Sequence, residues 1–259
     1  MERIDLPCLT TKILGRQALF FSRLDSTNQY GKEHGAQLPD GTVILAKEQF
    51  AGRGRQGRAW FIEPGSTLAM SVVVKGFPAS ALPLLPMGCG LAVSQAFGAI
   101  TGTPGPIKWP NDVLLGQKKA CGILCESRLG GENPYTICGI GINTGQPATF
   151  FEETGLPHAT SLRAEGFQVS PLEMASAILN TLEPILDTLR ADGFSSLCKA
   201  YSENCVTVGA SIRVIQKDGE RVGKAVAILP DGNLLADFDG RPEALCAGEV
   251  SVRGLYGYV

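Results

Sequence analysis

The residues best suited to chemistry lie in one short segment, residues 47–60. Three arginines alternate there with three glycines: Arg53, Arg55, Arg58, Gly52, Gly54 and Gly57. No acidic residue lies between Glu48 and Glu63. Glycines let the backbone approach a ligand closely, and guanidinium groups bind anions through paired N–H donors. The segment therefore predicts a phosphate or nucleotide site, with Trp60 as a flat ring for stacking.

The composition of the 259-residue chain indicates a globular protein with a sizeable core, because 44% of its residues are apolar and 19% are charged. A net charge of −2 gives no general attraction for nucleic acid, so the arginine segment is a local feature. No apolar run approaches the roughly 20 residues that span a bilayer, and the N-terminus lacks the apolar core of a signal peptide. We expect neither a membrane nor DNA as a partner.

The cysteines and histidines do not indicate a metal or nucleophilic site. The eight cysteines are scattered, and none forms a Cys-x-x-Cys pair. We interpret them as buried, reduced side chains, which together with the missing export signal favours a cytoplasmic protein. The two histidines, His34 and His158, lie in a helix-end pattern and a loop. An enzyme with this sequence is therefore expected to work through positioning and cationic charge rather than a histidine base.

Capping and turn signals predict the elements that position the arginine segment. Residues 25–28 offer N-caps for a short helix that ends near Gly35. Ser170, Pro171 and Glu173 begin a long helix toward Leu189, with a kink at Pro184. Two more helices are expected at 82–100 and 194–201. Strands are expected at 42–49, 67–74, 107–109, 113–115, 120–126 and 135–142. Because turns join consecutive strands, we predict an α+β fold, a mixed β-sheet flanked by helices.

The pattern changes at about residue 206. Short β runs at 211–216, 223–229, 234–238 and 249–253 are separated by Asp-Gly turns, which is typical of a small antiparallel barrel. We therefore expect two domains. A catalytic domain would span residues 1–205, and a C-terminal SH3-like β-barrel would span residues 206–259.

Six motifs follow one another along the chain: DSTN at 25–28, GRGRQGR at 52–58, KWPND at 108–112, KACGIL at 119–124, GIGIN at 139–143 and GEVSVR at 248–253. In this order and spacing they resemble the biotin–protein ligases, also called biotin–[acetyl-CoA-carboxylase] ligases, over nearly the whole chain. The resemblance implies a two-step reaction. The carboxylate of biotin attacks the α-phosphate of ATP, which gives biotinyl-5′-AMP and pyrophosphate. A lysine of a carrier domain then attacks this anhydride and releases AMP.

The resemblance also implies roles for individual residues. Since the carboxylate and the phosphate repel each other, cations must screen them, and the matching catalytic residues are Lys119, Arg55 and Arg53. Biotin would contact Ser26, Thr27, Asn28, Gln49, Gly52, Arg53, Gly54, Arg55, Lys119, Gly122 and Gly141. ATP would contact Arg53, Arg55, Arg58, Trp60, Lys108, Asn111, Asp112, Lys119, Asn143 and Arg253. No metal ligand is assigned, because Mg²⁺ arrives with the ATP. Glu249 matches a family position near the nucleotide, on the same strand as Arg253.

The residues by themselves leave several roles open. Ser26, Thr27 and Asn28 equally suit a helix cap, and Gln49 equally suits the end of a strand. Trp60 also suits a core position, and Asn143 a turn after a glycine-weakened strand. For Lys108 and Asp112, structural ion pairing is the alternative to ligand contact.

Two rival functions also remain. One is a lipoyl- or octanoyl-protein ligase on the same fold, and the other is a biotin sensor without catalysis. GRGRQGR and KWPND favour biotin, and a sensor of free biotin needs no phosphate-binding cations. The expected partner is a biotin carboxyl carrier protein domain, and a homodimer is compatible with the family. About 20 residues precede the first motif, so we expect a ligase without an N-terminal DNA-binding domain.

Overall fold

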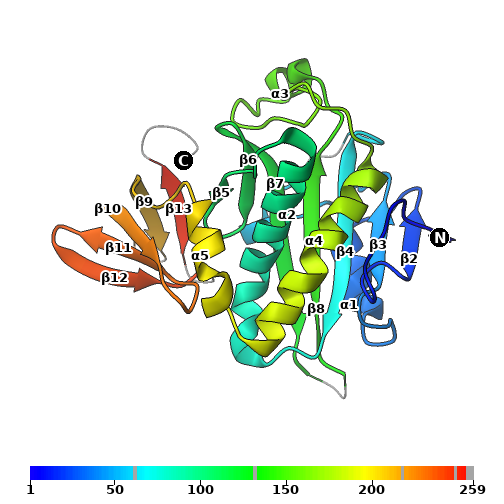
Figure 1. Ribbon diagram of the computed structural model, residues 1–259. Helices are drawn as coiled ribbons and strands as arrows, with labels where there is room; N and C mark the ends of the chain where they lie inside the picture. The colour runs from blue at the N-terminus through cyan, green and yellow to red at the C-terminus, as the bar shows by residue number, and fades with distance from the viewer. Residues whose placement is uncertain (61–62, 131–132, 217–218, 248–249, 255–259) are drawn as a thin grey trace.

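A computed structural model describes residues 1–60, 63–130, 133–216, 219–247 and 250–254, which form a large mixed sheet with helices and a small antiparallel sheet (Figure 1). The described residues of the large sheet form eight strands in the order β1-β2-β3-β4-β8-β7-β6-β5. All neighbours are antiparallel except β2 and β3, which are parallel. The strands are β1 (Glu2–Ile4), β2 (Ala18–Phe21), β3 (Val43–Ala46), β4 (Thr67–Lys75), β5 (Ile107–Lys108), β6 (Asp112–Leu115), β7 (Lys118–Arg128) and β8 (Tyr135–Asn143).

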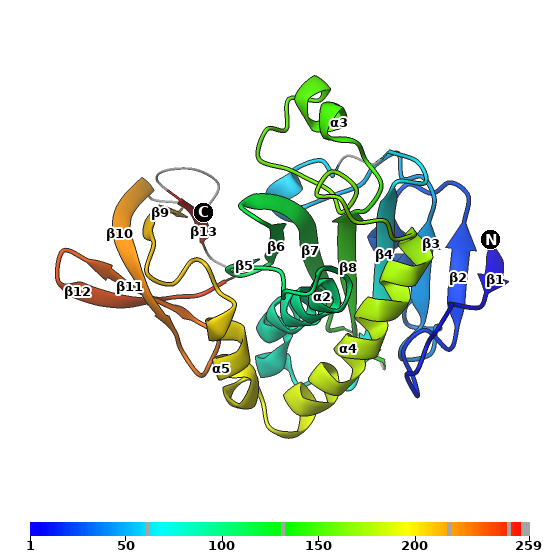
Figure 2. The same cartoon turned by 45° about the horizontal axis from the view of Figure 1, so that its top comes forward.

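The helices of the described residues cover both faces of this sheet. They are α1 (Thr27–His34), α2 (Leu85–Thr101), α3 (Ala148–Glu153), α4 (Pro171–Ala191) and α5 (Ser195–Glu203), with 3-10 turns at Arg55–Gly57 and Ala79–Leu84. Helices α2 and α4 pack side by side on one face, where the main core lies. Helix α1 lies on the other face over a smaller apolar cluster of β3, β4 and β8. Figure 2 shows α2 and α4 on the same side of the sheet.

Successive side chains of the central strands point to opposite faces of the large sheet. On β8, Cys138, Ile140 and Ile142 belong to the main core under α2 and α4. The intervening residues Gly139 and Gly141 point to the opposite face and carry no side chain there. This β8 pattern leaves open space on one face of the sheet while the other face is fully packed.

The capping signal of the long helix is confirmed. The Ser170 side chain accepts a hydrogen bond from the Glu173 backbone N–H at 3.2 Å, and the Glu173 carboxylate accepts from the Ser170 N–H at 2.9 Å. Helix α4 then continues through Pro184 to Ala191. At α1, by contrast, Ser26 occupies the N-cap position but its side chain makes no capping hydrogen bond.

The C-terminal strands form a sheet of their own. Its described strands are β9 (Ser211–Gln216), β10 (Gly219–Ile228), β11 (Leu234–Phe238), β12 (Arg241–Leu245) and β13 (Ser251–Gly254), in the order β12-β11-β10-β9-β13. The end strands β12 and β13 do not pair with each other in the part of the chain that is described, so we describe an antiparallel sheet rather than a closed barrel. The expected strand at 249–253 begins at Ser251, and Glu249 lies outside the described residues.

Trp109 joins the two sheets. Its side chain is fully buried, its backbone N–H donates to Thr207 Oγ1 at 3.0 Å, and its indole N–H donates to the Gly232 carbonyl at 3.1 Å. A parallel bridge between Ile107 and Cys205 lies beside it. The predicted boundary near residue 206 therefore falls on a tightly packed junction.

Sequence reasoning did not anticipate β1, β2, β12 or α3, which are short or lie at the sheet edges. Among the described helices, only the stretch Ala79–Thr101 has the length and apolar composition that a membrane-spanning helix needs. Most of it is buried inside the molecule, as in the core helix of a globular protein.

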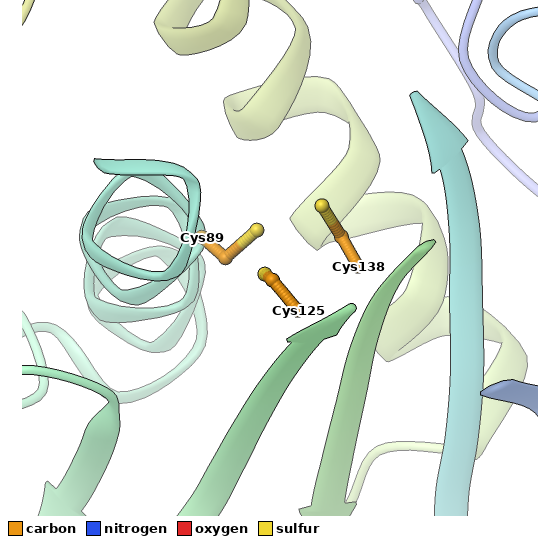
Figure 3. A group of neighbouring side chains, drawn as sticks. All are labelled: Cys89, Cys125 and Cys138. Carbon is orange, nitrogen blue, oxygen red and sulfur yellow. The ribbon is translucent and has the colours of Figure 1, made fainter. Parts of the chain in front are cut away.

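All eight cysteines lie in the described ranges and are free thiols. Three of them, Cys89, Cys125 and Cys138, point toward one another from α2, β7 and β8 (Figure 3), with their sulfur atoms within 4.8 Å of one another. No described histidine or carboxylate joins them, and apolar side chains surround them. A metal bound to three thiolates would leave a net charge in this apolar core, at a cost of several kcal/mol. We therefore interpret the three thiols as packing residues.

The capping box predicts a measurable loss of stability. Ser170→Ala removes the acceptor for the Glu173 N–H, and the free energy of unfolding should fall by about 1 kcal/mol. Glu173→Gln is the matched control, because an amide oxygen still accepts the reciprocal hydrogen bond. Urea denaturation of the three proteins measures both effects. Equal stability of Ser170→Ala and the parent would contradict this role.

Candidate active site

A row of small residues forms the floor of the site. Ala46, Ala69, Gly141 and Gly122 stand directly opposite one another across β3, β4, β8 and β7, and Asp112 of β6 ends the row. Directly opposed residues of antiparallel strands point to the same face. Two methyl groups and two glycines therefore leave a flat floor with a carboxylate at one end. Above it lies a cavity of about 400 Å³, within the size range of small-molecule sites.

Most of the residues assigned from the sequence line this cavity. They are Ser26, Thr27, Asn28, Gln49, Arg53, Gly54, Arg55, Arg58, Trp60, Asn111, Asp112, Lys119, Gly122, Gly141 and Asn143. Three assigned residues lie outside the lining: Gly52, Lys108 and Arg253. The fold thus brings five of the six sequence motifs largely together, although the first and the fifth are more than 100 residues apart, and the sixth contributes Ser251 and Val252.

A chain of polar contacts runs along the positive side of the cavity. The Lys119 ammonium forms an ion pair with Asp112 at 2.7 Å. Asn111 Nδ2 donates to the same carboxylate oxygen of Asp112 at 3.3 Å, and Asn111 Oδ1 accepts from Arg55 Nη1 at 2.8 Å. These contacts therefore hold four side chains in place before any ligand binds: Lys119, Asp112, Asn111 and Arg55.

Arg55 carries this network across to the small sheet. Its Nη2 donates to the backbone carbonyls of Ala247 and Val250, at 2.6 and 3.3 Å. Burial lowers the pKa of Arg55, while the nearby Asp112 carboxylate partly opposes this effect. The guanidinium is therefore a link between the glycine–arginine segment and the C-terminal sheet.

The cavity carries an excess of positive charge. Arg53, Arg55, Arg58 and Lys119 line it, against Asp112 as the single carboxylate among the described lining residues. In the described chain none of the three arginines forms an ion pair with a carboxylate; Arg58 instead contacts the Gln56 amide oxygen at 3.3 Å. Arg55 and Lys119 are partly buried, whereas Arg53 and Arg58 are exposed, and together they offer N–H donors and positive charge to phosphate groups.

The polar residues at the start of α1 differ in whether their side chains are already hydrogen-bonded within the protein. Gln49 Oε1 accepts from the backbone N–H and hydroxyl of Thr27, at 2.7 and 3.0 Å. Asn28 donates to the Leu124 carbonyl and to Glu126, and its oxygen accepts from Ser71. The amide N–H groups of Asn28 are thus both used within the protein, so it holds α1 on the sheet.

Ser26 is the anchor that remains available to a ligand. It is 5% exposed, and its hydroxyl makes no hydrogen bond within the described chain. Since Ser26 lines the cavity and does not cap α1, its hydroxyl is placed for a ligand.

Trp60 lies over the floor, and Asn143 follows Gly141 on the same face of β8. The Trp60 indole covers Gly122 and Gly141, and the Lys119 ammonium stands 5.6 Å from its ring centroid. Gly52 lets the chain pass close to Trp60, because a Cβ there would lie 2.7 Å from the Trp60 carbonyl oxygen. Asn143 is buried and donates to the Thr160 carbonyl at 3.0 Å.

Lys108 is buried beneath the cation cluster. Its side chain is 6% exposed, and burial lowers its pKa to about 8, with further lowering by Lys119, Arg253 and Arg58. The Asp112 carboxylate opposes the shift. Arg253 itself lies on β13 outside the cavity lining.

Sequence reasoning missed one wall of the cavity. Phe150 and Phe151 of α3 line it together with residues 155–159. This segment also fixes Lys119, whose N–H donates to the His158 carbonyl at 2.8 Å and whose carbonyl accepts from the Thr160 N–H at 2.9 Å. The segment contains the exposed pair Glu152 and Glu153 but no cationic or glycine-rich motif, so only its place in the fold reveals it.

The site therefore combines a flat apolar floor, a cationic rim and a few polar anchors. Such an arrangement suits a ligand with an apolar body and a carboxylate that must approach a phosphate. This defines the class of a nucleotide-dependent ligase that activates a carboxylic acid.

Comparisons with known proteins identify the family. The sequence profile of the Biotin/lipoate A/B protein ligase family matches residues 20–143. A "Biotin--[acetyl-CoA-carboxylase] ligase" of Mycobacterium tuberculosis is 34% identical over 218 residues, which cover 82% of this chain and 79% of that protein. The chain therefore belongs to this family.

Two further relatives match over nearly their full length. The protein of the same name from Paracoccus denitrificans is 31% identical over 238 residues, covering 90% of this chain and 99% of that one. The structure of a biotin protein ligase from Aquifex aeolicus in complex with biotin and ATP superimposes with a TM-score of 0.78 at 28% identity. It covers 92% of this chain and 98% of the other.

The lowered pKa of Lys108 predicts a pH-dependent stability. The folded chain holds this proton less tightly than the unfolded chain, so the unfolded state binds more protons between about pH 8 and pH 10.5. The contribution of Lys108 to the free energy of unfolding therefore rises across this window, by up to about 3 kcal/mol. Lys108→Met lacks this rise, so the parent should gain stability relative to it as the pH increases.

Urea denaturation at several pH values measures this difference. Lys108→Arg is the matched control, because it stays charged throughout the window and should also fail to gain. Parallel stability curves for the parent and Lys108→Met would show that Lys108 keeps an ordinary pKa.

Proposed function

We propose that this chain is a biotin–protein ligase that activates biotin with ATP and transfers it to a lysine of a biotin carboxyl carrier protein domain. One observation carries the proposal: four cationic side chains line a cavity whose floor is a row of two alanines and two glycines. The floor would bind the apolar ring system of biotin, and the cations would bind the two anions that must react, the biotin carboxylate and the α-phosphate of ATP. The family membership and the relatives named as biotin ligases support the same function.

In the first step, Lys119 is placed to screen the repulsion between the biotin carboxylate and the α-phosphate. Its ammonium lies beside Gly122, only 3.3 Å from where a Cβ would be, so a carboxylate that reaches it lies over the floor. The carboxylate oxygen forms a bond to the α-phosphorus, and pyrophosphate leaves. Arg53 and Arg58 face the phosphates, where preorganised positive charge stabilises the transition state.

In the second step, a carrier lysine attacks the carbonyl carbon of biotinyl-5′-AMP. An amide bond forms, and AMP leaves. The ring of Trp60, 5.6 Å from the Lys119 ammonium, and the amide of Asn111, bonded to Arg55, would suit an adenine. Asn143, which lines the cavity, would complete the nucleotide side, and Lys108 would act on it only through its charge, because it lies outside the lining.

Magnesium enters this account with the ATP. Asp112 is the one carboxylate among the described lining residues and is already paired with Lys119. The ion would therefore be held mainly by phosphate oxygens and water, as is usual for Mg²⁺. It would supply positive charge that stabilises the leaving pyrophosphate.

Further assignments follow from the same function. Residues 1–205 would form the ligase domain, and residues 206–259 the domain that closes the nucleotide side through the contacts of Arg55. The carrier would belong to acetyl-CoA carboxylase or another biotin-dependent carboxylase. A reducing cytoplasm suits the eight free cysteines. Pairing along an exposed sheet edge would give a homodimer.

The function is tested by ATP–pyrophosphate exchange with biotin, lipoate and octanoate offered separately. We expect exchange with biotin alone, because the floor suits the fused ring of biotin and the cations suit the carboxylate of biotin. Exchange with lipoate or octanoate in place of biotin would favour a lipoyl- or octanoyl-protein ligase. No exchange with any acid would favour a biotin sensor.

The contacts of Arg55 predict that the variant Arg55→Gly releases the reaction intermediate. Arg55→Gly breaks the contacts to Asn111, Ala247 and Val250, so the segment is no longer fastened over the adenylate. We expect release of biotinyl-5′-AMP and biotinylation of lysines on an unrelated added protein. Gln56→Gly is the matched control, because it adds flexibility in the same segment without touching Arg55. Equal retention of the intermediate by the parent and Arg55→Gly would exclude this role.

A further inference from the structure

A half-buried carboxylate lies beneath α1, outside the lining of the cavity. Glu126 follows Gly122 and Leu124 on β7, and alternation places it on the same face of the sheet as the floor. Its two oxygens have different partners. Oε1 accepts from the Lys32 ammonium at 2.7 Å, and Oε2 accepts from Asn28 Nδ2 at 2.9 Å. One carboxylate therefore contacts both a lysine along α1 and a buried amide at its start.

The contact with Glu126 fixes the direction in which the Asn28 amide points. Asn28 Nδ2 donates to the carboxylate and, at 3.1 Å, to the Leu124 carbonyl. Both partners can only accept, so a flipped amide would set its own oxygen against two acceptors. Asn28 Oδ1 is held instead over Gly139, where a Cβ would collide with it. Because Asn28 is buried, the loss of either acceptor would be costly.

Two hydroxyls connect the Asn28 amide to the cavity. Ser71 Oγ lies 2.7 Å from both Asn28 Oδ1 and Thr27 Oγ1 and donates to them. Gln49 Oε1 accepts from the Thr27 hydroxyl at 3.0 Å and from the Thr27 backbone N–H at 2.7 Å. Both lone pairs of this oxygen are then used. Gln49 therefore offers N–H donors to a ligand in the cavity that it lines.

We propose that Glu126 is a positioning residue for biotin, which acts without touching it. Its carboxylate sets the orientation of the Asn28 amide, and through Ser71 and Thr27 it keeps the N–H donors of Gln49 available to the ligand. The inference rests on the proposed function in taking biotin as the ligand of this cavity. The carbonyl of the ureido ring of biotin is an acceptor that suits these donors.

Two single variants separate this role from the ion pair with Lys32. Glu126→Ala leaves an Asn28 N–H without its acceptor and lets the amide turn. Its dissociation constant for biotin should rise about 10-fold, as expected when a buried polar group loses its partner. Lys32→Met is the matched control, because it breaks the same ion pair but keeps the Asn28 contact. Its dissociation constant should stay within about 2-fold of the parent. Isothermal titration with biotin in the absence of ATP measures both values.

Glu126→Gln gives a test in which the removal of Lys32 restores binding. A glutamine has one carbonyl oxygen, which Lys32 and Asn28 would both need. The ammonium is the charged donor and should hold that oxygen, which turns the glutamine N–H groups against Asn28. Glu126→Gln alone should therefore bind biotin several-fold more weakly than the parent. Combination with Lys32→Met frees the oxygen for Asn28, so the double variant should recover most of the affinity. This comparison remains decisive if Glu126→Ala does not fold.

ATP–pyrophosphate exchange gives the kinetic readout. In Glu126→Ala the KM for biotin should rise about 10-fold, while kcat and the KM for ATP stay near the parental values. The reason is that none of these contacts involves Lys119 or the arginines of the cavity.

Three results would overturn the proposal: parental affinity in Glu126→Ala, an equal loss of affinity in Lys32→Met, or no recovery in the double variant. A parent that binds no biotin would instead contradict the proposed function, and this inference with it.

Discussion

The direct pairing of Gly122 with Gly141 is the constraint on which the site depends. Because the two glycines oppose each other in the middle of the large sheet, one face of β7 and β8 carries no side chains there. The other face of the same strands is packed against α2 and α4. The sheet can therefore be rigid on its helical side and open on its ligand side. Any side chain at either glycine would enter the space that a ligand, or the Trp60 indole, occupies.

Charge is arranged around this floor by contacts that link the two sheets. The Lys119–Asp112 ion pair continues through hydrogen bonds of Asn111 and Arg55 to the backbone carbonyl of Ala247, in the connection between β12 and β13. The small sheet is thus fastened to the site through one guanidinium and through the buried Trp109. This explains why the small sheet, which contributes few lining residues, still belongs to the site.

The sequence was most informative where a residue type has one dominant physical use. Ser170 and Glu173 predicted the capping box that is observed, and the central strands were found because their apolar runs are long. The motifs of the site were recognisable because alternating glycine and arginine has few other uses. Short edge strands such as β1 and β2 gave too few residues for a pattern. The wall formed by α3 and residues 155–159 is set by tertiary contacts to Lys119, and the indole on the floor depends on packing between distant segments. Ser26 looked like a helix cap, but its side chain makes no capping bond.

A crystal structure of the chain with biotinyl-5′-AMP tests the glycine floor most directly. The account predicts that the biotin group lies across Gly122 and Gly141, with the carbonyl–phosphate junction next to the Lys119 ammonium. An adenylate bound away from these glycines would contradict it.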